Sequence, residues 1–178
     1  MKNVIVIPAI RPEAKNLDKF GGWGWMQYSI DAWRFWCDKN SYQLVVYDKP
    51  SISDTSKYRV TVQRWFDVFN FLEEKNIEYD QICMVDAAYL PKWDCPDFFK
   101  LADGKFTATH EFDNLKWVYE SIQGYKSLFD NYELDVFDYF NTGLVVFNKN
   151  HKQLFQSFKQ MYIEKEDSLI NLQMNLRR

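Results

Sequence analysis

The sequence predicts an α/β fold, in which a mostly parallel β-sheet is flanked by helices within a single domain of residues 1–178. Short apolar segments alternate along the chain with longer segments whose apolar residues recur at helical spacing, and this alternation is typical of α/β proteins. A chain of 178 residues suits one domain. Hydrophobic residues make up 47% of the chain and charged residues 26%, as in ordinary globular proteins.

Five short apolar segments are predicted to be strands because they are rich in β-branched residues and end at turn-forming residues. The first strand ends at Pro8, which has no backbone N–H to continue a β-ladder. The third is followed by Asp86 and two alanines. The predicted strands are residues 4–8, 43–47, 81–85, 106–109 and 142–147.

Helices are predicted where apolar residues recur every three or four positions. In residues 58–75, this spacing places Val62, Phe66 and Phe69 on one side of one predicted helix. The predicted helices are residues 26–39, 58–75, 97–102, 115–129, 152–163 and 167–176.

Charge and cysteine content exclude several classes of protein. The formal net charge of −3 does not favour binding to nucleic acid. The chain has three cysteines, Cys37, Cys83 and Cys95, and no two of them form a C-x-x-C motif. The odd number and the spacing argue against a disulfide framework and a zinc site. We therefore expect reduced cysteines in a cytoplasmic protein. No segment approaches the ~18 consecutive apolar residues of a transmembrane helix.

Ligands of parallel sheets bind beyond the carboxyl ends of the strands, so the residues that follow strands are the first candidates for a site. The strongest candidate is Asp86, because a buried strand delivers its carboxylate to the sheet edge after a helix that contains Arg64. A carboxylate in this position can coordinate a divalent ion that bridges a diphosphate. The other interpretation is an aspartate that stabilises a turn. The chain has neither a P-loop nor a dinucleotide-binding glycine motif.

Four separate segments, in chain order, resemble a nucleotide-sugar glycosyltransferase with the Rossmann-like GT-A fold. Residues 63–68 and 84–88 together are similar to the helix and D-x-D motif of the blood-group A and B transferase family. Residues 139–148, which include Phe-Asn-Thr-Gly, look like the F-N-[TS]-G strand of the glycogenin and lipopolysaccharide galactosyltransferase family. Residues 4–11 and 45–48 look like the first two strands of such enzymes.

A fifth segment indicates a retaining enzyme. Residues 166–171, E-D-S-L-I-N, are similar to the D-E-S-x-L-N run of the blood-group family and to the D-Q-D-x-L-N run of the galactosyltransferases. The resemblance implies that Asp167 faces the anomeric carbon and that Glu166 lies beside it as a second catalytic candidate. The other interpretation is that Asp167 begins a helix, since aspartate is favourable at a helix N-terminus.

The resemblance implies transfer of a hexose from a UDP-sugar to a hydroxyl acceptor, with retention and with help from Mn²⁺ or Mg²⁺. Asp86 would hold the metal, and Asp48 would accept a hydrogen bond from the nucleotide base. Arg11 and Arg64 would bind the diphosphate, and Asn141 would contact sugar or acceptor hydroxyl groups. The remaining donor-binding candidates are Pro8, Ala9 and Ala88.

The chain departs from the family pattern in two places. Ala88 stands where the metal motif has its second carboxylate. Either Asp86 holds the metal together with diphosphate and water, or another side chain helps, or the reaction needs no metal. The family's C-terminal H-x-x-G-x-x-K-P-W run is also absent, so we expect a short or truncated member.

Two alternative functions remain. A catalytically degenerate module that only binds nucleotide sugars fits both departures. A nucleotidyltransferase is the weaker alternative, because it usually carries a glycine-rich loop after the first strand and I-P-A-I-R-P-E-A-K-N-L contains no glycine.

Overall fold

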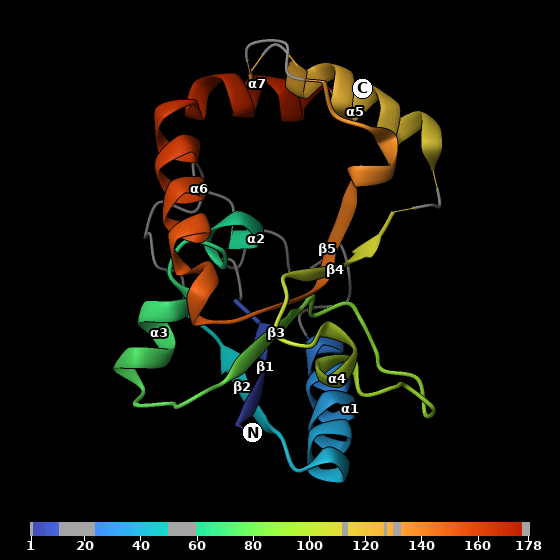
Figure 1. Ribbon diagram of the computed structural model, residues 1–178, viewed down its shortest axis with the longest axis vertical. Helices are drawn as coiled ribbons and strands as arrows, with labels where there is room; N and C mark the ends of the chain where they lie inside the picture. The colour runs from blue at the N-terminus through green and yellow to red at the C-terminus, as the bar shows by residue number, and fades with distance from the viewer. Residues whose placement is uncertain are drawn as a thin grey trace.

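A five-stranded mixed β-sheet forms the centre of the computed structural model (Figure 1). The strand order is β2-β1-β3-β5-β4. Strand β1 (Asn3–Pro8) pairs in parallel with β2 (Gln43–Tyr47) and with β3 (Gln81–Val85). Strand β5 (Phe140–Phe147) is antiparallel to β3, and β4 (Thr107–His110) is antiparallel to β5. Because β4 therefore runs in the same direction as the first three strands, the sheet is mostly parallel, as predicted.

The structure describes residues 2–10, 24–49, 60–111, 114–126, 128–129 and 133–175. All five predicted strands are present, and their ends differ from the prediction by at most two residues. Every residue of β3 is buried, because this central strand has helices over both of its faces.

Two hydrophobic clusters cover the two faces of the sheet. Helices α1 (Trp25–Asn40) and α4 (Phe98–Ala102) pack on the face that presents Cys83 and Val85. Helices α3 (Val68–Glu74) and α6 (Lys152–Glu164) pack on the opposite face. Alternate residues of β3 point to opposite faces, so one apolar strand supplies both clusters.

A third cluster joins the helices beyond the sheet. It links α6 to α2 (Val60–Gln63), α5 (Leu115–Lys126) and α7 (Glu166–Asn175) through apolar side chains. Figure 1 shows α5 and α7 together at the top. Gly124 of α5 leaves room for the side chain of Leu172 of α7. The short 3-10 helices η2 (Val136–Asp138) and η3 (Lys149–His151) flank β5.

The prediction of one helix over residues 58–75 is wrong. Within the described part of that range, α2 ends at Gln63 and α3 begins at Val68, with a turn between them. The turn is closed by hydrogen bonds of the i→i+3 type, from Trp65 N to Val62 O and from Phe66 N to Gln63 O. The apolar residues keep a helical spacing across this turn, but they do not pack on one surface. Phe66 packs in the third cluster, whereas the apolar residues of α3 pack against the sheet.

Within the residues that the structure describes, none of the helices has the length and apolar character needed to span a bilayer. The three cysteines are free thiols, and Cys37 and Cys83 are buried. Burial raises the pKa of Cys37 from 9.0 to about 12 and raises the pKa of Cys83 well above its usual range.

Candidate functional site

The carboxyl ends of β1, β2 and β3 lie level at one edge of the sheet. Pro8 is opposite Tyr47, and continuing the register of β1 with β3 places Pro8 level with Asp86. The backbone N–H of Ala9 donates to the carbonyl of Tyr47 at 2.9 Å, so Ala9 is held at the same edge. Because β1 lies between β2 and β3, the backbones of Asp48 and Asp86 are two strand spacings apart, which is about 10 Å.

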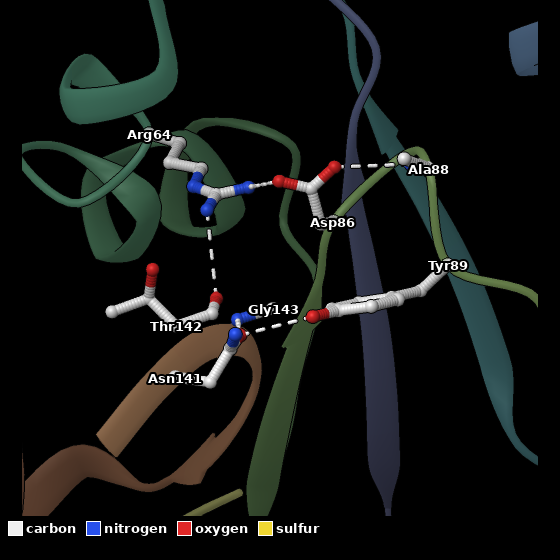
Figure 2. A network of polar contacts seen from close by, with 7 residues as sticks. All are labelled: Arg64, Asp86, Ala88, Tyr89, Asn141, Thr142 and Gly143. Atoms are coloured by element: carbon white, nitrogen blue, oxygen red, sulfur yellow. Dashed lines mark hydrogen bonds and ion pairs between the residues drawn. The ribbon is translucent and has the colours of Figure 1, made fainter. Parts of the chain in front are cut away.

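A buried arginine is paired with the carboxylate of Asp86 at this edge (Figure 2). Arg64 Nη1 lies 3.1 Å from Asp86 Oδ2. The Arg64 side chain is only 6% exposed, whereas the Asp86 side chain is 35% exposed. Burial lowers the pKa of Arg64 and Asp86 opposes that shift, so the guanidinium keeps its charge at neutral pH.

The turn between α2 and α3 places Arg64 in this position. Because α2 stops at Gln63, the arginine side chain leaves the helical path and reaches the end of β3. Arg64 Nη2 also donates to the carbonyl of Thr142 at 3.5 Å, and the guanidinium lies 5.2 Å from the centre of the Trp65 ring. The break in the predicted helix is therefore part of the site.

The second oxygen of Asp86 organises the loop that follows. Asp86 Oδ1 accepts a hydrogen bond from Ala88 N at 3.0 Å, and Asp86 O accepts one from Tyr89 N at 2.9 Å. These bonds form a tight turn directly after β3. The turn-stabilising interpretation of Asp86 is confirmed by the bond to Ala88, while the other carboxylate oxygen meets Arg64. The role of Asp86 in binding a ligand stays a prediction.

The Asn-Thr-Gly run lies beside this turn, because β5 pairs with β3. Asp86 N donates to Gly143 O at 2.7 Å. Asn141 Oδ1 accepts from Gly143 N at 2.6 Å and from the hydroxyl of Tyr89 at 3.0 Å. The amide nitrogen of Asn141 donates to Glu111 at 2.6 Å. Asn141 is therefore the centre of a polar network that connects the loops after β3 and β4.

Glycine at position 143 lets the Tyr89 ring lie directly against the backbone of β5. A Cβ atom built at Gly143 would be 1.4 Å from Tyr89 Cε2. The carbonyl of Tyr89 is in turn held by Ser29 Oγ at 2.8 Å and by Trp33 Nε1 at 2.9 Å, both from α1. Figure 2 shows the Tyr89 side chain with its hydroxyl toward Asn141, near Gly143.

The side chains around Asp86 do not offer a metal-binding donor set in this arrangement. Divalent ions such as Mg²⁺ take several oxygen ligands. Both oxygens of Asp86 already accept hydrogen bonds, and Ala88 supplies no ligand. Among the described residues, no group of three or more His, Cys, Asp or Glu side chains is placed to hold an ion. The expectation of Mn²⁺ or Mg²⁺ stays a prediction.

The structure brings together some of the predicted site residues and places others elsewhere. Arg64, Asp86, Ala88 and Asn141 form one network. Pro8 ends β1 at the same edge, and Ala9 and Asp48 follow β1 and β2 there, with Asp48 exposed. Arg11 lies outside the described residues.

The two catalytic candidates lie on α7. Glu166 is buried, whereas Asp167 is exposed in the first turn of the helix. A negative charge in the first turn interacts favourably with the helix dipole, which agrees with the interpretation of Asp167 as a residue that begins a helix. The catalytic roles of Glu166 and Asp167 stay predictions.

Tyr89 and Glu111 also belong to the network, although they are not among the predicted site residues. Tyr89 comes three residues after Asp86, and Glu111 directly follows β4. Both residues therefore follow strands, and this position is the feature of the sequence that marks them as site candidates. Their hydrogen bonds to Asn141 depend on the pairing of β5 with its neighbours and could not be read from local spacing.

No protein-family model matches this chain, and no curated protein matches it significantly. Among solved structures, a glycosyltransferase involved in the glycosylation of the major capsid of PBCV-1 is similar, with a TM-score of 0.53 and 8% sequence identity. The match covers 88% of this chain and only 64% of that protein. This chain therefore has the α/β fold of a glycosyltransferase, over part of that protein's length.

Proposed function

We propose that this protein is a glycosyltransferase that binds a nucleotide sugar at the carboxyl edge of β1, β2 and β3. The observation that carries the proposal is the buried Arg64 paired with the more exposed Asp86 at that edge. A likeness in fold to a glycosyltransferase supports it. In open α/β sheets this edge is the usual place for a ligand.

The charges of the pair favour particular groups of the donor. Asp86 is the more exposed partner, so a ligand meets a carboxylate whose charge is balanced from behind by Arg64. Such a carboxylate is suited to accept hydrogen bonds from sugar hydroxyl groups. Arg64 is 6% exposed and lies behind Asp86, so its positive charge favours a phosphate group nearby without direct contact.

We infer a UDP-sugar donor and retention of configuration from the resemblance of residues 45–48 and 166–171 to known transferases. In the transfer, the bond from the anomeric carbon to the diphosphate oxygen breaks, and its electron pair leaves on UDP. The acceptor oxygen forms the new bond, and its proton passes to the departing phosphate or to a carboxylate. Positive charge nearby favours this step because negative charge grows on the leaving group. A divalent ion bound to the diphosphate would supply the same stabilisation.

Thermal denaturation with UDP, GDP and CDP, each with MnCl₂ or with EDTA, tests the proposal. A ligand at 100 times its Kd stabilises the folded state by about 2.7 kcal/mol. For a chain of this length, that free energy raises Tm by roughly 5–11 °C. We expect UDP to give the largest shift. The EDTA series shows whether a metal is needed, and absence of a shift with every nucleotide and either additive would contradict the donor site.

Asp86→Asn tests the position of the site. The substitution keeps an oxygen for Ala88 N but removes the charged acceptor for sugar hydroxyl groups, so we expect a UDP-sugar to lose the part of its Tm shift that exceeds the shift with UDP. Asp80→Asn is the matched control, because Asp80 immediately precedes β3 at the opposite edge of the sheet. Equal UDP-sugar shifts in the two variants would place the donor sugar elsewhere.

A nucleotide-sugar-binding module without catalysis remains the second candidate, and Ala88 in place of a metal ligand favours it. Release of UDP from a UDP-sugar separates the two functions. Binding of UDP-sugar with no release, in the presence of varied hydroxyl acceptors and either Mn²⁺ or EDTA, identifies the module.

A further inference from the structure

A cavity of about 200 Å³ lies between α6, β5 and the turn that carries Arg64. Its described lining consists of five aromatic side chains, two aliphatic side chains and one threonine, with no charged residue. Trp65, Phe140 and Phe158 are among the aromatic residues. Leu154 also lines it and is 53% exposed. This is a strongly apolar cavity that is open to solvent on the side of α6.

The cavity shares a wall with the candidate donor site. Thr142 supplies the one hydroxyl group in the lining, and its backbone carbonyl accepts from Arg64 Nη2. Trp65 lines the cavity and also has the Arg64 guanidinium 5.2 Å from its ring centre. A ligand in the cavity would therefore lie beside the Arg64–Asp86 pair, with Thr142 between them.

We propose that this cavity binds an aromatic ring of the acceptor, whose hydroxyl group receives the sugar. This inference rests on the proposed function and names the acceptor class. An apolar protein cavity of about 150 Å³ holds benzene, so 200 Å³ accommodates a ring with a small substituent. The aromatic lining favours a ring, because edge-to-face and offset contacts stabilise aromatic pairs. The absence of charge in the lining disfavours a phosphate or carboxylate, which would be left unpaired there.

Binding of 4-fluorobenzyl alcohol, followed by its ¹⁹F NMR signal, tests the cavity without requiring activity. The probe combines a ring with one hydroxyl group, and glycerol serves as the hydroxyl compound without a ring. We expect the probe to bind and glycerol not to compete with it. Failure of the probe to bind at millimolar concentration would overturn the proposal.

Leu154→Trp tests the location, because the larger side chain projects into the open side of the cavity. We expect the Kd of the probe to rise at least tenfold. Leu101→Trp is the matched control, since Leu101 is an exposed helical leucine that does not line the cavity. Equal affinity in the two variants would overturn the assignment. If Leu154→Trp does not fold, Leu154→Arg makes the same test by placing a charge at the rim.

The two proposals fail in different ways. Binding of UDP without binding of the aryl alcohol refutes the acceptor cavity and leaves the donor site intact. Binding of the aryl alcohol that weakens in Leu154→Trp, without binding of any nucleotide, refutes the proposed function and leaves an aromatic-binding cavity. If both hold, the aryl alcohol should accelerate release of UDP from the sugar donor in the parent protein more than in Leu154→Trp.

Discussion

Replacing Gly143 by alanine should break the contact that joins the loop after β3 to β5. The new Cβ atom would be 1.4 Å from the Tyr89 ring, whereas ordinary contact begins near 3.4 Å. The ring must therefore move by about 2 Å. Its backbone cannot follow easily, because Ser29 and Trp33 hold the Tyr89 carbonyl. The side chain would rotate outward, and the hydrogen bond from its hydroxyl to Asn141 would be lost.

The expected cost follows from these two effects. Loss of the hydrogen bond costs about 0.5–1.5 kcal/mol. Forcing the ring off its present rotamer costs about 1–3 kcal/mol. Tyr89 is 42% exposed and has room to move outward, so we expect the free energy of unfolding to fall by about 1–3 kcal/mol. Gly24→Ala is the control, because a Cβ atom at Gly24 would meet nothing within 4 Å.

Urea denaturation of a double-mutant cycle tests the cause of this loss. The three atoms nearest to the built Cβ all belong to the Tyr89 side chain. In a Tyr89→Ala background, Gly143→Ala should therefore cost close to nothing, and the two substitutions should couple strongly. Equal destabilisation by Gly143→Ala in the presence and absence of the Tyr89 ring would refute the reasoning.

Three further predictions concern α7 and the thiols. If Asp167 stabilises charge in the transition state, Asp167→Asn should lower donor hydrolysis by ~10²-fold with little change in Tm, whereas a purely structural aspartate would leave hydrolysis unchanged. Cys95 is the least buried cysteine, so Ellman's reagent should modify it first and reach Cys37 and Cys83 only on unfolding; prompt reaction of all three would contradict their burial. Because burial raises the pKa of Cys37 to about 12, the stability linked to its proton is complete below pH 9 and is lost as the pH rises toward 12. The urea midpoint of the parent should then fall more steeply over this range than that of Cys37→Ala, and parallel decline would contradict the linkage.

The sequence by itself determined the strands and the class of the fold. Apolar β-branched segments such as residues 81–85 must be buried on both faces, and the amphipathic segments between them can bury their apolar sides only against the sheet. Asp86 could be placed at the sheet edge for the same reason, since it directly follows a buried strand. These conclusions depend on local spacing, which a single sequence displays.

Only the tertiary structure decided how the site is assembled. The spacing of Val62, Phe66 and Phe69 is compatible with one helix, but those side chains serve different clusters, and the turn between α2 and α3 sends Arg64 to Asp86. The cavity beside that pair likewise exists only because α6 returns over β5. Such contacts join residues far apart in the chain, and their geometry depends on packing energies that local periodicity does not contain.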